Sequence, residues 1–218
     1  TSKTLMLPQM WQNADTKKTD ASGNEYAPEQ VVYNSYISKE LFDPSGSIMG
    51  ELEFAFSSGS HTVTLEKETG SVIISESALS APVTSEKYDD IIKQYKDSKY
   101  SEYSGDPIII EGEDATLKST RSLVAKSDNS SADILPKNAV NSVLNYIGDS
   151  NWSEPGEELI WDIEIPEDGL YKIGFNYKQD KVINGTSYRS LKIDGKYPFE
   201  EAKKIKFDYG TSRQFVST

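Results

Sequence analysis

The chain has 218 residues, a length that allows one large domain or two small ones with a hydrophobic core. Its 35 acidic and 23 basic residues give a formal net charge of −12, and such a negative surface repels phosphate backbones and anionic lipid. We therefore expect no nucleic-acid partner. We also expect no membrane insertion, because no apolar run approaches the roughly 20 residues that span a bilayer. There is no basic-then-apolar leader either, so we expect any targeting segment to lie outside this sequence.

Residue usage removes several kinds of chemistry. Cysteine is absent, which excludes disulfides, thiolate nucleophiles and cysteine-based zinc sites, and His61 is the only histidine. The sequence has no nucleophile elbow, phosphate-binding loop or zinc-protease motif. With 13 tyrosines and 14 glycines the composition favours a β-rich chain with many turns.

The first 80 residues have the period-two pattern of short strands separated by turns. Leu52, Phe54 and Phe56 alternate with polar or small residues, and His61 begins a second row that continues through Val63 and Leu65. A polar, turn-rich stretch at 13–24 reads as a flexible loop. The pattern predicts strands at 5–7, 31–32, 36–41, 52–56, 63–65 and 72–74.

Residues 81–107 differ from their surroundings and predict a helical connector. Tyr88, Ile91, Ile92 and Tyr95 fall on one helical face, and Ser85 is the predicted N-cap.

Strand patterns return from Ile108. They predict strands at 108–110, 159–165, 170–177, 187–193 and 205–209, with a long loop over 118–142. Trp161 alternates with Ile163 and Ile165, so we expect it to pack in the core.

Several motifs in this second region resemble the first half of a carbohydrate-binding jelly roll, similar to carbohydrate-binding-module families 35 and 6. They are Glu111-Gly112-Glu113, Trp152-Ser153-Glu154-Pro155-Gly156, Ile165-Pro166-Glu167-Asp168-Gly169-Leu170-Tyr171 and Arg189-x-Leu191-x-Ile193-Asp194-Gly195. Residues 3–80 resemble the second half of such a domain, ending in Phe54-x-Phe56-x-x-Gly59-x-His61-Thr62-Val63-Thr64-Leu65. Modules of this kind occur in secreted glycoside hydrolases and in long extracellular solute-binding proteins of gut Firmicutes.

The resemblance implies an all-β jelly-roll sandwich with a short helical connector. Its parts are the second half of one repeat (1–80), the connector (81–107) and the first half of the next repeat (108–218). Because half a sandwich exposes a strand edge and half a core, we expect the halves to complete one permuted sandwich. The alternative is a domain-swapped dimer with the same contacts between chains.

The resemblance also implies a structural Ca²⁺ held partly by Glu111 and Glu113. If these residues lie in a strand, both carboxylates point to one side, where a cation that prefers oxygen ligands would stabilise them. Solvated acidic residues at a sheet edge are the alternative interpretation.

Sugar recognition requires an aromatic face and planar hydrogen-bonding groups. The predicted aromatic faces are Trp11, Tyr36, Trp152 and Tyr188, and the predicted polar partners are Gln12, Asn151 and Arg189. Burial is the competing explanation for each aromatic residue.

These observations favour a non-catalytic module that binds a polysaccharide or oligosaccharide, extracellular or on a bacterial cell surface. A structural spacer domain is one alternative. A glycoside hydrolase domain is another, since 35 acidic residues supply many carboxylate pairs although none is singled out.

Overall fold

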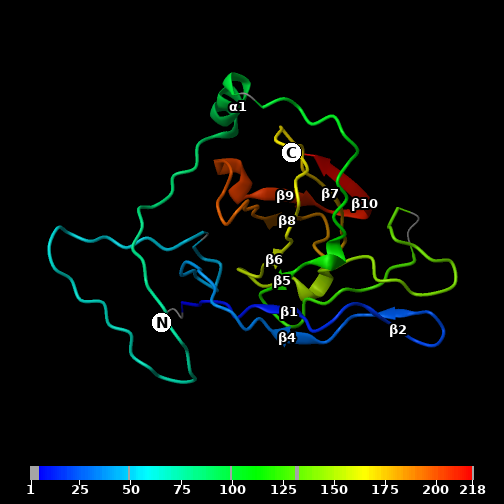
Figure 1. The fold of residues 1–218 in the computed structure, drawn as a ribbon, viewed down its shortest axis with the longest axis horizontal. Coiled ribbons are helices and arrows are strands. Elements are labelled where there is room, and N and C mark those ends of the chain that lie inside the picture. Colours follow the sequence, from blue (N-terminus) through cyan, green and yellow to red (C-terminus); the bar gives the residue numbers. More distant parts are fainter. Residues whose placement is uncertain (1–4, 49, 99, 131–132, 218) are drawn as a thin grey trace.

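A computed structural model describes residues 5–48, 50–98, 100–130 and 133–217, with the backbone alone described for 211–217 (Figure 1). The strands are β1 (Trp11–Asn13), β2 (Lys18–Thr19), β3 (Glu25–Tyr26), β4 (Gln30–Val32), β5 (Leu117–Lys118), β6 (Leu159–Ile160), β7 (Gly174–Gln179), β8 (Thr186–Arg189), β9 (Ile205–Asp208) and β10 (Gly210–Ser217). The helices are α1 (Tyr88–Asp97) and the short 3₁₀ turns η1 (Gly112–Asp114), η2 (Asp149–Asn151) and η3 (Glu200–Lys203).

The largest sheet joins strands near the start of the sequence to strands from its middle. Its order is β4-β1-β5-β6, and all of its pairs are antiparallel. Trp11 of β1 pairs with Val32 of β4 on one side and with Lys118 of β5 on the other. The described residues therefore form a β-rich fold in which segments about a hundred residues apart share one sheet.

The remaining strands form the two-stranded sheets β10-β7, β2-β3 and β8-β9, so the described sheets do not close. The ring of Phe207 on β9 lies 4.8 Å from Tyr177 and 6.0 Å from Phe175 on β7, which packs these two sheets together. The fully buried apolar side chains are Met10, Ala115, Leu123, Ile134, Leu144 and Ala202.

Sequence alternation locates the strands from β6 to β9, but it fails at 108–110 and in part of the first half of the chain. Strands β6, β7, β8 and β9 fall within or overlap their predicted segments, and β4 covers 31–32. The predicted loop at 13–24 instead contains most of the β2-β3 hairpin, whose turn runs through Ser22 and Gly23. The predicted strand at 108–110 is not paired, and Met6 makes only an isolated bridge to Phe42.

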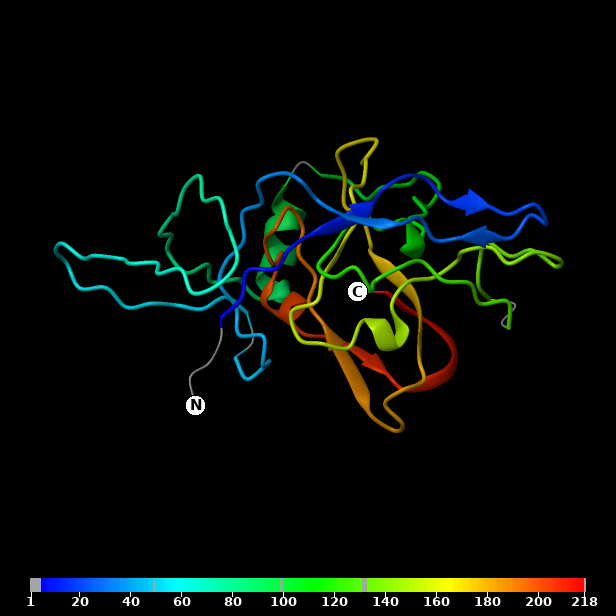
Figure 2. The same cartoon turned by 90° about the horizontal axis from the view of Figure 1, so that it is seen from below.

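The predicted strands at 36–41, 52–56, 63–65 and 72–74 are wrong. We call residues 52–84 the arm; its side chains are exposed apart from a half-buried Leu52, and it projects away from the sheets (Figures 1 and 2). Among the residues of the arm, only Leu52 makes a backbone hydrogen bond to the described part of the chain: its amide donates to the carbonyl of Leu41. Alternation supplies two faces, but a strand also requires a partner for its amides and carbonyls.

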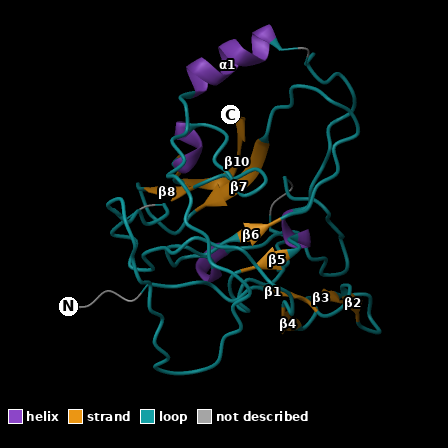
Figure 3. Ribbon diagram, turned by 60° about the vertical axis from the view of Figure 1, so that its left-hand side comes forward, coloured by secondary structure: helices purple, strands orange, loops and turns teal. Residues whose placement is uncertain are grey.

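Helix α1 forms within the predicted connector and is amphipathic: Ile91, Ile92 and Tyr95 are half-buried on one face, and the rest of the helix is exposed. The predicted N-cap is wrong: Lys87 occupies that position, and the buried hydroxyl of Ser85 has no hydrogen-bond partner among the described residues. The carboxylate of Glu201 accepts the amide of Tyr88 at 2.9 Å. The capping carboxylate therefore comes from η3, at a distant position in the sequence (Figure 3).

No helix in the described ranges combines the length and the hydropathy needed to cross a membrane.

Candidate functional site

Three of the predicted ligand-binding residues come together where η2 meets β8. The guanidinium carbon of Arg189 lies 4.2 Å from the centre of the Trp152 ring, and its Nη2 donates to the Trp152 carbonyl at 2.9 Å. Burial lowers the pKa of Arg189, and the nearby charge of Glu157 acts in the opposite direction. The pair is a cation–π stack closed by a hydrogen bond, which fixes the ring relative to the strand.

Asn151, next to this stack, is held by the loop that precedes it in the sequence. Its Nδ2 donates to the carbonyl of Ser122 at 2.8 Å, and its Oδ1 accepts from Lys126 at 3.3 Å. Its amide thus already has partners within the chain.

The Trp152 indole fixes the turn that follows it. Its Nε1 donates to the carbonyl of Glu157 at 2.9 Å, and the amide of Glu154 donates to the Glu157 carboxylate at 3.1 Å. The sequence predicts that Trp152 is a stacking face. The structure shows in addition that it holds residues 153–157 in a defined shape.

That turn forms one wall of an open groove of about 330 Å³, which we call the turn groove. Its polar lining comprises Gln9, Ser119, Thr120, Glu154 and Glu157, and its apolar lining includes Pro8 and Pro155. The volume is at the lower end of ordinary small-ligand sites.

Trp11 and Gln12 lie on β1, both half-buried, beside the strand that leads into this groove. Trp11 pairs with Lys118, which directly precedes the lining residue Ser119, and the guanidinium of Arg121 lies 6.0 Å from the Trp11 ring. The groove is therefore lined by the segment that precedes Trp11 and by the turn that follows Trp152, and neither tryptophan is among its lining residues.

The two predicted tyrosines lie elsewhere. Tyr36 is 68% exposed and belongs to no strand. Tyr188 alternates with Arg189 along β8, so its side chain points to the other face, where Lys204 lies 4.6 Å from its ring. The seven predicted ligand residues do not form one continuous surface.

The acidic pair Glu111 and Glu113 is not in a strand, contrary to the geometry expected from the sequence. Glu111 precedes η1 and Glu113 lies within it, so the shared-side argument does not apply. Glu113 is 1% exposed, its Oε1 accepts from Lys17 at 3.3 Å, and its Oε2 has no partner among the described residues. Burial raises the pKa of Glu113.

The unpartnered oxygen of Glu113 is a possible cation ligand, but the surrounding donors do not fit a calcium site in this arrangement. The ammonium of Lys17 lies between Glu113 and Asp114, at 3.3 and 3.2 Å. No group of three or more acidic residues or histidines gathers around a possible metal position in the described ranges. Calcium stays a prediction.

His61 and Trp161 are both less buried than the alternation indicated. His61 is exposed, and its ring contacts the Ser57 carbonyl at 2.9 Å and the edge of Phe56 at 5.4 Å. Trp161 is half-buried and donates from Nε1 to the Gly112 carbonyl at 3.2 Å.

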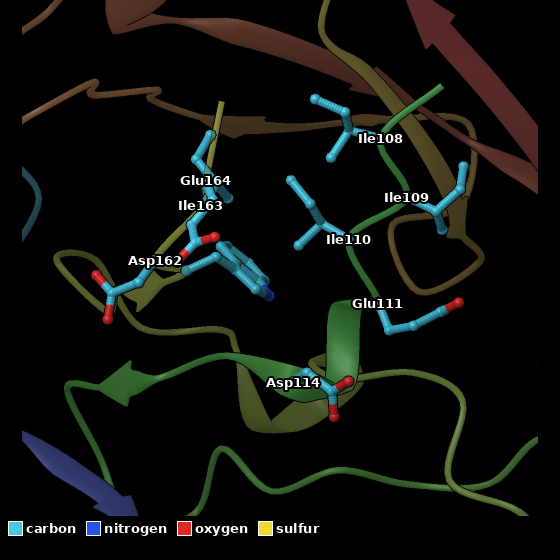
Figure 4. Close-up of a pocket in the computed structure, with 9 residues that line it drawn as sticks. Ile108, Ile109, Ile110, Glu111, Asp114, Asp162, Ile163 and Glu164 are labelled. Atoms are coloured by element: carbon cyan, nitrogen blue, oxygen red, sulfur yellow. The ribbon is translucent and has the colours of Figure 1, made fainter. Parts of the chain in front are cut away.

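Trp161 lines a second groove of about 380 Å³, which we call the isoleucine groove. Two extended segments, 108–111 and 161–164, form its walls, and Asp114 completes it. Figure 4 shows Ile108 and Ile110 pointing toward the opposite segment and Ile109 pointing away. The three consecutive isoleucines were the sequence signal for this feature, but their pattern predicts a strand, and the structure shows an extended segment outside the described sheets.

Sequence reasoning missed one buried polar cluster altogether. Lys118 is 1% exposed, and its Nζ donates to Asn13 Oδ1 at 2.7 Å and to Gln30 Oε1 at 3.0 Å. Burial lowers the pKa of Lys118 to about 8. Lys118 lies at the start of the segment predicted as a polar loop, and the pairing of β5 with β1 on one side and β6 on the other encloses it.

Comparison with known proteins adds no relative: no family model matches the chain, and neither the curated proteins nor the solved structures contain a significant match. The likeness to carbohydrate-binding jelly rolls therefore stays a prediction from the motifs quoted above.

Proposed function

We propose that this chain is a non-catalytic carbohydrate-binding β-sandwich module, acting outside the cell or on a bacterial cell surface, and that a polysaccharide or oligosaccharide binds in the turn groove. The observation that carries the proposal is the position of this groove. It is lined by the segment before Trp11 and by the turn after Trp152, and Trp152 holds that turn through the bond to Glu157.

The lining of the groove suits hydroxyl-rich ligands. The side chains of Gln9, Ser119 and Thr120 can both donate and accept, and the carboxylates of Glu154 and Glu157 accept from sugar hydroxyls. No aromatic residue lines the groove among the described residues, and the proline rings at Pro8 and Pro155 take the place of the expected aromatic face as apolar surface for the C–H face of a pyranose. An open, shallow site of this kind gives weak, reversible binding.

The jelly-roll part of the proposal is supported by the shared sheet. Strands β1 and β4 come from residues 1–80, and β5 and β6 come from residues 108–218. Pairing of Trp11 with Lys118 is the contact through which the two regions would form one sandwich.

A glycan array, probed in calcium and again in EDTA, tests the proposal. We expect binding to a defined glycan, and loss of binding in EDTA alone would support the predicted Ca²⁺. Ligand-induced quenching of tryptophan fluorescence would give the affinity. A blank array in both conditions would contradict the proposal and favour a spacer domain, and release of reducing sugar would favour a hydrolase.

Variants locate the site. We expect Glu157→Gln and Thr120→Ala each to weaken glycan binding on the order of tenfold, because the first replaces a charged acceptor with a weaker neutral amide and the second removes a hydroxyl from the groove. Glu66→Gln, an exposed change in the arm, is the matched control and is expected to bind as the wild type does. Equal affinity in all three variants would move the site away from the turn groove.

A further inference from the structure

The arm exposes apolar side chains in a continuous stretch of chain. Val63, Val72 and Ile73 are 70, 78 and 80% exposed, and Phe54, Leu65 and Leu79 are exposed as well. Scattered exposed apolar residues are ordinary, but an extended segment of this length with unpaired backbone is a template for strand pairing.

The exposed area of the chain is large for its mass. It exposes 16160 Å² at 24.3 kDa, whereas a folded monomer of that mass exposes about 10,000 Å². The excess, roughly 6,000 Å², exceeds the roughly 1,000–2,500 Å² that one chain contributes to an obligate dimer interface. The chain therefore carries enough uncovered surface for a stable interface.

The walls of the isoleucine groove also have backbone groups without hydrogen bonds to the described residues. No backbone hydrogen bond within the described ranges involves Ile108–Ile110 on one wall or Ile163 and Glu164 on the other. Its floor is aliphatic, with Ile108 and Ile110 directed across it (Figure 4). Two unpaired extended walls about an apolar space accept an extended strand better than a sugar, which needs hydroxyl partners.

The arm is anchored on the side of the molecule away from its own groove. Glu51 pairs with Lys192 at 2.7 Å before the arm, and the Glu86 carbonyl accepts the amide of Glu200 at 2.8 Å after it. Both ends are thus fixed near η3, and the arm extends to the far side of the molecule from segment 108–111 (Figure 1).

We propose that the arm of one chain inserts into the isoleucine groove of a second copy, and that the exchange is reciprocal. Strand addition pairs the free backbone of both elements and buries their apolar rows, while the anchors at Glu51 and Glu86 stay in place. The exchange closes a two-fold dimer, and it does not depend on carbohydrate binding.

Like charges on the two surfaces oppose this association, so its strength should depend on salt concentration. The arm carries Glu53, Glu66, Glu68 and Glu76 against Lys67, and the groove is lined by Glu111, Asp114, Asp162 and Glu164. Both surfaces are negative, so salt should strengthen the dimer by screening their repulsion.

Sedimentation equilibrium of the full chain across concentration and salt tests the proposal. We expect a dimer of the 24.3 kDa chain, favoured by salt. The arm variant Phe54→Asp with Val63→Asp and the groove variant Ile110→Asp should each weaken dimerisation by 100-fold or more, because each places a charge in an apolar contact. Val140→Asp, an exposed change outside both surfaces, is the matched control and should dimerise normally.

Mixing the two defective variants makes the test specific. Together they retain one intact arm and one intact groove, so the mixture should form a heterodimer that neither variant forms alone. The proposed exchange would be overturned if the wild type stayed monomeric at every concentration, or if both variants dimerised fully. It would also be overturned if the mixture stayed monomeric, or if the mass of the wild type grew without limit instead of stopping at a dimer.

Hydrogen exchange on the wild type needs no variant. Amides of residues 53–75 should exchange freely in dilute protein and become protected as the dimer forms. Dimerisation with these amides still unprotected would contradict the proposal.

Discussion

The sheet β4-β1-β5-β6 and the arm differ in which side chains they bury. Lys118 in the sheet and Glu113 in the η1 turn are charged residues, yet each is only 1% exposed. In the arm, the apolar residues Val72 and Ile73 are largely exposed to solvent. Hydropathy alone would predict the reverse. What distinguishes the two regions is backbone pairing: β5 has a neighbour on each side, and the arm has none beyond its first residue.

A polar residue can thus be buried when the neighbouring strands supply its hydrogen-bond partners. Asn13 from β1 and Gln30 from β4 both direct amide oxygens at Lys118, and the Gln30 amide in turn donates to Asn13 at 2.8 Å. The cluster is uncharged apart from the ammonium, which explains why burial lowers the lysine pKa.

The largest expected effect follows from removing this lysine. Lys118→Ala should lower the free energy of unfolding by about 2–4 kcal/mol, because it leaves a cavity and takes the donor from two buried oxygens. Urea denaturation would measure the change. Lys96→Ala, at an exposed position of α1, is the matched control, with an expected change of less than about 0.5 kcal/mol. Equal effects at the two positions would remove the distinction drawn between the regions.

The next effect is a pH dependence. The pKa of Lys118 is about 8 in the folded chain against 10.5 ordinarily, so between these values the unfolded chain binds more protons. The free energy of unfolding should therefore rise with pH over this window, by about 1–3 kcal/mol. Lys118→Met, which retains the side-chain volume, should lack this contribution. A constant difference between wild type and Lys118→Met from pH 7 to 11 would contradict the lowered pKa.

A smaller effect is expected at the stacked pair in the second half of the chain. Arg189→Ala should cost about 1–2 kcal/mol of stability, because it removes the stack on Trp152 and the bond to the Trp152 carbonyl. It should also change tryptophan emission by exposing the ring. Arg189→Lys keeps the charge but not the planar stack and should recover only part of the loss. Full recovery would show that charge alone matters here.

The smallest effect is expected in the arm. At concentrations where the chain is monomeric by mass, Val63→Ser should change the free energy of unfolding by less than about 0.5 kcal/mol, because the side chain is already exposed. The same substitution in the core costs several times more. A clear loss of stability in the monomer would mean that the arm packs on its own chain.

The sequence predicted some elements because their signals were local and strong. The helical face of Ile91, Ile92 and Tyr95 placed α1 correctly, and alternation around Tyr188 and Phe207 located β8 and β9. The same reasoning failed in the arm, where Phe54, Val63 and Ile73 alternate or cluster as well but have no neighbouring strand.

The candidate site was only partly visible in the sequence. Trp152 and Arg189 were both singled out, and the structure stacks them. Glu154 to Gly156 belong to a quoted motif but were not predicted to bind a ligand, and Glu157 and Ser119 were not singled out, because a turn becomes a wall only when the residues opposite it are known. Gln9 and Thr120 meet across this groove from segments more than a hundred residues apart.

By itself, the sequence determined the acidic, cysteine-free and β-rich character of this protein and the position of its helix, since these depend on composition and on contacts a few residues apart. Only the tertiary structure decided that Lys118 and Glu113 are buried, that Glu201 caps α1, and that two grooves flank the shared sheet. The physical reason is that burial and hydrogen bonding depend on which strands pair, and β1 pairs with a strand far along the chain.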